Sequence, residues 1–147
     1  MRFTISILTF FVSISLTGQV KKITKEDVST IGKIGRNIEI TKTGNEYTIT
    51  YNDINFTIDE YKSFSFKDLD NDFENLYKMI SEGFETPPKD PIKIELPNDI
   101  IWLKFKKSLG TVNLQIDHAV DKNENVIGTS IFMTKRRVRK LFGKQRK

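Results

Sequence analysis

The chain has 147 residues, with 24 Lys and Arg, 19 Asp and Glu, one His and no Cys, so disulfides, zinc sites of the usual kind and Cys nucleophiles are excluded. Its stability must come from a hydrophobic core, for which 11 Phe, four Tyr and one Trp supply the material. Eight of the basic residues follow Thr134, and without these and Arg2 the remaining 15 basic and 19 acidic residues make a mildly acidic body, which argues against general nucleic-acid binding.

The N-terminal segment predicts export. Arg2 precedes an apolar run, residues 3–16. This run is too short for a transmembrane helix, which needs roughly 20 residues, but it suits the core of a signal peptide, which needs about 7–15. Small residues at the end of the run place the cleavage near Gly18. We therefore expect residues 1–18 to be a signal peptide, with an uncleaved signal anchor as the alternative.

The rest of the chain is expected to hold one domain. Residues 19–36 form a lead-in, either a short helix or a loose segment, because a capping pattern at Thr24 favours a helix whereas Gly32 weakens it. Residues 37–143 form a single α+β domain, and residues 144–147 form a basic tail.

The first half of this domain predicts four strands. Apolar residues alternate with polar ones over residues 38–40, 47–51, 54–58 and 60–66, with a two-residue hairpin turn at Asn52-Asp53. Alternation of this kind indicates antiparallel strands with one buried face and one wet face.

A helix should follow these strands. Its apolar stripe has helical spacing and runs over Leu69, Phe73, Leu76, Tyr77, Ile80 and Phe84. Ser65 is a candidate N-cap, and acids fill the first turns, as the helix dipole favours. The Pro-rich residues 86–91 then exclude helix.

The second half is expected to repeat this layout. It predicts strands at residues 92–96, 100–107, 111–120 and 125–134, and then an amphipathic helix capped by Thr134, docked through Val138, Leu141 and Phe142 and stopped at Gly143. The fold is thus α+β, an antiparallel sheet of about 7–8 strands in two strand-rich halves, each followed by a helix packed on the sheet.

Motifs for metals and cofactors are incomplete, and no cofactor is expected. Residues 68–79 and 121–132 both start like calcium loops, but neither has the Gly at position six or the Glu at position twelve. We interpret the first as acids at a helix start and the second as a hairpin turn. No phosphate-binding Gly loop and no G-x-S-x-G motif is present.

His118, the single His, lies on the apolar face of its strand with Val112, Leu114 and Ile116. We interpret it as a satisfied core or edge histidine, and assign no catalytic residue. The alternative is an uncharacterised hydrolase that uses His118 or a pair of acids.

Two surface features are candidates for binding. Trp102 lies on the face opposite Leu103; it is either covered by a helix or exposed as part of a binding surface. The final helix carries a basic face that is either solvated or contacts an anionic surface. This candidate anion-contact face consists of Lys135, Arg136, Arg137, Arg139 and Lys140.

Residues 60–143 resemble a group of small exported proteins of Bacteroidota with no assigned activity. The segments that carry the resemblance are "SFSFKDLDNDFENLYKMISEGFE", "ELPNDIIWLKF", "SLGTVNLQIDHAV" and "TKRRVRKLFGK". The resemblance implies export and a protein that is not an enzyme, and it transfers no catalytic residue.

Together these features predict a small exported binding or structural module, periplasmic or envelope-associated or secreted, with no membrane span after signal cleavage. Its expected partner is an anionic envelope component, contacted through the basic helix, or another envelope protein. Nucleic acid is the alternative partner if the chain is not exported.

Overall fold

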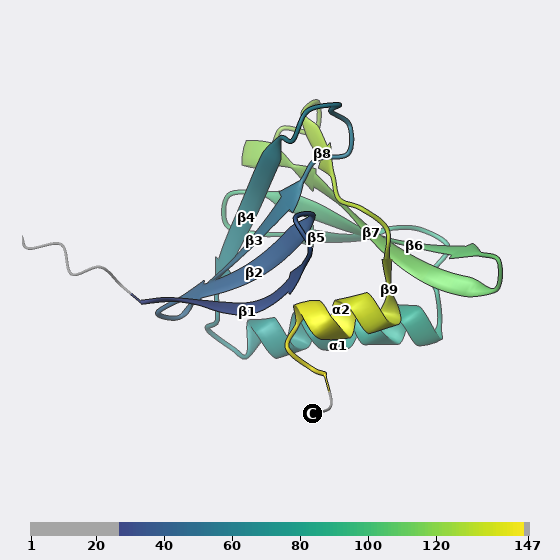
Figure 1. Cartoon of the computed structure of the whole chain (residues 1–147), viewed down its shortest axis with the longest axis horizontal. Helices are drawn as coiled ribbons and strands as arrows, with labels where there is room; N and C mark the ends of the chain where they lie inside the picture. Colours follow the sequence, from purple (N-terminus) through teal and green to yellow (C-terminus); the bar gives the residue numbers. More distant parts are fainter. Residues whose placement is uncertain (1–26, 146–147) are drawn as a thin grey trace, which may run out of the picture.

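The computed structural model describes residues 27–145, which form two antiparallel sheets and two α-helices (Figure 1). The first sheet has the order β1-β2-β3-β4, with the bounds Val28–Ile34, Ile38–Thr43, Glu46–Asn52 and Tyr61–Lys67. The second has the order β5-β6-β7-β8, and β9 also pairs with β7; the bounds are Ile92–Glu95, Ile100–Ser108, Thr111–Ala119, Ile127–Thr129 and Met133–Thr134. Helix α1 (Asp72–Glu85) follows the first sheet and α2 (Lys135–Leu141) the second. The predicted α+β fold of two strand-rich halves, each followed by a helix, is confirmed.

The alternating pattern of the first sheet is confirmed at its buried face. Ile40 pairs with Ile49, and Ile49 pairs with Phe64, so these three side chains form one cross-strand row in the core. In the neighbouring row Thr48 pairs with Ser65, and both are half-buried. The sheet therefore has one apolar face toward the core and one polar face, as antiparallel sheets commonly do.

Residues 54–58 do not form the strand that their alternation predicts, and Asn52-Asp53 is not a two-residue hairpin turn. Residues 53–60 form a loop between β3 and β4 in which Ile54, Phe56 and Ile58 are 47%, 49% and 82% exposed. Side chains bind part of the loop backbone: Asn52 Oδ1 accepts from the Glu60 amide, and Asp53 Oδ1 from the Asn55 amide. These local bonds compete with strand pairing.

Residues 19–36, expected to be a short helix or a loose segment, are neither in the part that the structure describes, where β1 pairs with β2. Gly32 lies in this strand because the backbone of α2 passes over it: a Cβ at this position would lie within 3.0 Å of the carbonyl oxygens of Lys140 and Leu141. Residues 1–26, which include the expected signal peptide, lie outside the described residues, as do residues 146 and 147 of the expected tail.

Helix α1 begins later than predicted. Its N-cap is Asn71, in the left-handed region at φ 64°, and Ser65 lies in β4, where its hydroxyl donates to Glu46 instead of capping the helix. Leu69 therefore precedes the helix and is 72% exposed. The rest of the predicted stripe is confirmed, with Tyr77 half-buried and four side chains in the core: Phe73, Leu76, Ile80 and Phe84.

The last predicted strand, residues 125–134, is divided into β8 and β9. Ser130 separates them; it is fully buried, and its hydroxyl accepts the Ile116 amide of β7 while donating to the Ile131 carbonyl. The Ser130 amide still donates to the Ile116 carbonyl, but the Ile116 amide binds the Ser130 hydroxyl in place of a backbone carbonyl. The predicted N-cap of α2 is confirmed, because the Thr134 hydroxyl accepts the Arg137 amide.

The two helices lie side by side below the sheets (Figure 1). Phe142, directly after α2, stacks on Phe73 of α1 with ring centroids 5.1 Å apart and also lies 5.3 Å from the ring of Tyr77. Val138 and Leu141 of α2 are buried, as predicted. Within residues 27–145 no helix is both long and apolar enough to span a bilayer.

Candidate functional site

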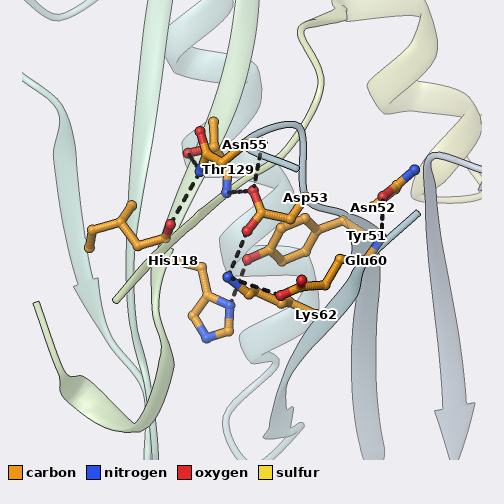
Figure 2. A network of polar contacts seen from close by, with 9 residues as sticks. Tyr51, Asn52, Asp53, Asn55, Glu60, Lys62, His118 and Thr129 are labelled. Carbon is orange, nitrogen blue, oxygen red and sulfur yellow. Dashed lines mark hydrogen bonds and ion pairs between the residues drawn. The ribbon is translucent and has the colours of Figure 1, made fainter. Parts of the chain in front are cut away.

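His118 is fully buried between the sheets, which confirms its interpretation as a satisfied core histidine. Its Nδ1 lies 2.9 Å from the hydroxyl of Tyr51, and its Nε2 lies 2.8 Å from Oδ1 of Asp99. Figure 2 shows the Tyr51 hydroxyl pointing at the imidazole ring. Both ring nitrogens are occupied, and no part of the ring reaches solvent.

Tyr51, His118 and Asp99 form a hydroxyl–imidazole–carboxylate series, the order found in a catalytic triad. The Tyr51 hydroxyl, however, is not activated as a nucleophile. Burial raises the pKa of Tyr51, and the nearby carboxylates of Asp53, Asp117 and Asp99 raise it further. An activated nucleophile needs the opposite change, a pKa lowered toward neutrality. The hydroxyl therefore stays protonated and acts as a hydrogen-bonding group between β3 and β7.

A second buried polar pair adjoins this chain. The Asp53 side chain is fully buried, and its Oδ2 accepts from Lys62 Nζ at 2.6 Å. Its Oδ1 accepts the amides of Thr129 and Asn55 (Figure 2). Burial acts to raise the pKa of Asp53, but the hydrogen bonds from Lys62, Thr129 and Asn55 outweigh it and hold the pKa below 3.8. Asp53 is thus an ionised anchor that joins the loop 53–60 and β4 to β8.

These partners were missed in the sequence because they come from separate segments. Asp99 precedes β6, Tyr51 lies in β3 and Lys62 in β4. The one local signal was the pair Asn52-Asp53, which we assigned to a turn. Both polar groups suit a structural role, because His118 and the Asp53 side chain are fully buried and the Lys62 side chain is only 15% exposed.

The acids at the start of α1 accept hydrogen bonds from backbone amides. Asp68 Oδ1 accepts the amide of Phe73, and Asp72 Oδ2 accepts the amide of Leu69. These contacts agree with our interpretation of residues 68–79 as a helix start.

Two residues of the predicted basic face contact other parts of the protein, and three are free. Lys135 forms an ion pair with Glu85 of α1, and Arg139 is half-buried with Nη2 donating to the Lys144 carbonyl. Arg136, Arg137 and Lys140 are exposed, and within the described part of the chain no carboxylate lies in ion-pair range of them. We name these three residues the α2 cationic face.

The first turn of α2 also runs against helix electrostatics. Lys135, Arg136 and Arg137 follow the Thr134 cap, and the turn contains no acid. The N-terminal end of a helix carries partial positive charge, so cations there are unfavourable by a few tenths of a kcal/mol up to about 1 kcal/mol each. The ion pair with Glu85 compensates Lys135, whereas Arg136 and Arg137 have no ion-pair partner among residues 27–145. Departures of this kind are expected at functional or strained sites.

Trp102 is half-buried on the face of the second sheet opposite Leu103. It lies in a cross-strand row between Lys93 and Asp117, and Lys93 Nζ is 5.4 Å from the centre of its ring. This cation covers part of the ring, so Trp102 is neither enclosed in the core nor fully exposed.

A groove of about 550 Å³, absent from our sequence analysis, runs between β4 and β5, the edge strands of the two sheets, and beside α1. Its size suits a small ligand. Its apolar lining consists of Phe66, Leu69, Leu76, Met79, Ile94 and Leu96. In the sequence, only Leu69 could have indicated this groove, and we had assigned it to the apolar stripe of the predicted helix. The charged lining consists of Glu46, Lys67, Asp72 and Glu95, and Glu95 also forms an ion pair with Lys122.

Comparison of the chain with protein-family models, with curated proteins and with solved structures finds no match.

Proposed function

We propose that the protein is an exported, non-catalytic binding module whose α2 cationic face contacts an anionic component of the cell envelope. The observation that carries this proposal is the exposure of Arg136, Arg137 and Lys140 on one docked helix, without ion-pair partners among residues 27–145. The signal-like N-terminal sequence supports the cell envelope as the location of this contact.

The packing of α2 supports a fixed surface rather than a loose basic tail. Val138 and Leu141 are buried, and Lys135 and Lys144 are paired with Glu85 and Glu74 of α1. These contacts hold the helix, so its free cations keep a constant spacing. A fixed cationic patch attracts anionic partners in a manner that weakens with salt.

The test is binding of the purified protein to dextran sulfate, a soluble polyanion, over a range of salt concentrations. The triple substitution R136Q/R137Q/K140Q should weaken binding by about tenfold or more near 0.1 M salt. The matched control is K67Q/K78Q/K89Q, which removes three exposed lysines outside α2 and should change binding much less. Equal loss in both variants, or no loss in either, would refute a specific α2 surface.

Export is tested separately, by the intact mass of the protein from fractionated cells. A mass for a chain starting near Gln19 in the periplasm supports the proposal. A full-length mass in the cytoplasm contradicts it and favours the nucleic-acid alternative. The hydrolase alternative gains no support at His118, because both ring nitrogens are bonded and the ring is fully buried.

A further inference from the structure

The hairpin between β6 and β7 ends in an unfavourable turn. Ser108 pairs with Thr111, which leaves Leu109 and Gly110 as a two-residue turn with φ values of 48° and 79°. Two positive φ angles characterise the type I′ hairpin turn, for which Asn-Gly is strongly preferred. Leu at the first position therefore carries backbone strain that Asn would avoid.

Leu109 also gains nothing from burial. Its side chain is fully exposed, at 103% of the reference area. The space around the tip is open, since a Cβ added at Gly110 would meet no atom within 4 Å. Figure 1 shows the hairpin extending past β9 and the adjacent end of α2. A fully exposed apolar residue thus lies in the turn of this hairpin, in an unfavourable backbone conformation.

The charge around this tip has one sign. Between Leu103 and Ile116 the hairpin carries three lysines and no acid. Lys106 and Lys107 are exposed beside the tip, whereas Lys104 is paired with Asp117. Lys106 of β6 lies opposite Asn113 of β7, which lies opposite Thr134 of β9. Only β7 therefore separates Lys106 from the residue that precedes α2.

We propose that the hairpin tip docks on an anionic lipid bilayer, with Leu109 inserted below the headgroups and Lys106 and Lys107 against the lipid phosphates. This inference rests on the proposed function, and it identifies the anionic envelope component as lipid. Apolar side chains and lysines combine in this way at membrane surfaces, where each Lys near an anionic bilayer favours binding by about fivefold. A polysaccharide offers no apolar layer for Leu109, and a lone protruding side chain suits insertion into a fluid layer.

The test is cosedimentation of the full chain with vesicles of phosphatidylglycerol and phosphatidylcholine, compared with phosphatidylcholine alone. Leu109→Asn should weaken binding to the anionic vesicles about tenfold, the lower range for burying a Leu side chain. Because Asn suits the positive φ, this variant should be at least as stable as the wild type. Ile58→Asn is the matched control: it removes an 82% exposed apolar side chain from another loop and should leave binding unchanged.

A second measurement reports insertion directly. In a Trp102→Phe background, the fluorescence of Leu109→Trp should shift to shorter wavelength on anionic vesicles. Loss of binding in K106Q/K107Q and this blue shift together support the inference. Wild-type binding in Leu109→Asn without a blue shift in Leu109→Trp overturns it.

Binding to dextran sulfate separates this inference from the proposed function, because a soluble polyanion has no layer for Leu109. If the protein binds dextran sulfate through α2 but does not bind vesicles, the membrane inference fails and the proposed function stands. If it binds neither, both fail. Capture of a protein by the tip, with no affinity for vesicles, also overturns the inference.

Discussion

The hydroxyl of Tyr51 lies 2.9 Å from Nδ1 of His118 and joins the two sheets of the protein. Tyr51 belongs to β3 and His118 to β7, and the chain between them contains α1 and three further strands. Gly128 of β8 makes room for this contact, because a Cβ there would collide with the Tyr51 hydroxyl. The bond therefore determines how closely the sheets approach at this point of the core.

Tyr51→Phe should destabilise the fold by about 1–3 kcal/mol, because it leaves a buried nitrogen of His118 without its partner. The free energy of unfolding from urea denaturation measures this change. Tyr61→Phe is the control, since Tyr61 is 49% exposed, and it should be nearly neutral. Equal effects of the two substitutions would contradict the role given to the buried hydroxyl.

The contribution of Tyr51 should also depend on pH. Burial raises its pKa above the ordinary value of 10.0, so the unfolded chain loses this proton first. The stabilisation is complete below pH 10 and is lost as pH rises from there toward the raised pKa of the folded state. The stability difference between wild type and Tyr51→Phe should therefore shrink above pH 10 in urea denaturation. A difference that stays constant up to strongly alkaline pH would argue against the raised pKa.

Asp53→Asn should lower the free energy of unfolding at pH 7 by about 2–3 kcal/mol. This is less than for a fully buried ion pair, because the Lys62 side chain is 15% exposed and Glu60 remains 3.8 Å away. The pKa of Asp53 is lowered, so its stabilisation is present above the unfolded value of about 3.8 and is lost as pH falls toward the folded value. Wild type and variant should converge in acid. Glu39→Gln, which removes the exposed pair with Lys33, should cost under about 1 kcal/mol.

Gly32→Ala should loosen the docking of α2 and destabilise the protein by about 1–3 kcal/mol, because the added Cβ overlaps backbone oxygens that cannot rotate away. Hydrogen exchange should accelerate at the amides of α2 more than at those of β3. Ser29→Ala, an exposed position on the same strand, serves as the control. Unchanged protection of α2 would show that β1 and the helix do not approach as closely as described.

Much of the fold followed from local patterns. Alternation over residues 47–51 and 111–119 marks strands because successive side chains point to opposite faces, and the 3.6-residue stripe of α1 and the Thr134 cap mark helices. The same reasoning was wrong for residues 54–58, where alternation is present but Asn52 and Asp53 bind the loop backbone. It was also wrong for β1. There we interpreted Gly32 as a residue that weakens a helix, whereas it lies in a strand at the point where the backbone of α2 comes closest.

The α+β class, most of the strands, both helices and the core position of His118 could be predicted from the sequence, because they depend on periodicity along the backbone. The packing of distant segments, by contrast, sets how the strands divide between two sheets and which cations of the last helix stay free. Lys135 and Lys144 are neutralised by acids 50 and 70 residues away on α1. Partners at such separations meet through packing, which local residue patterns do not encode, and so Arg136, Arg137 and Lys140 emerge as the free face only in the folded molecule.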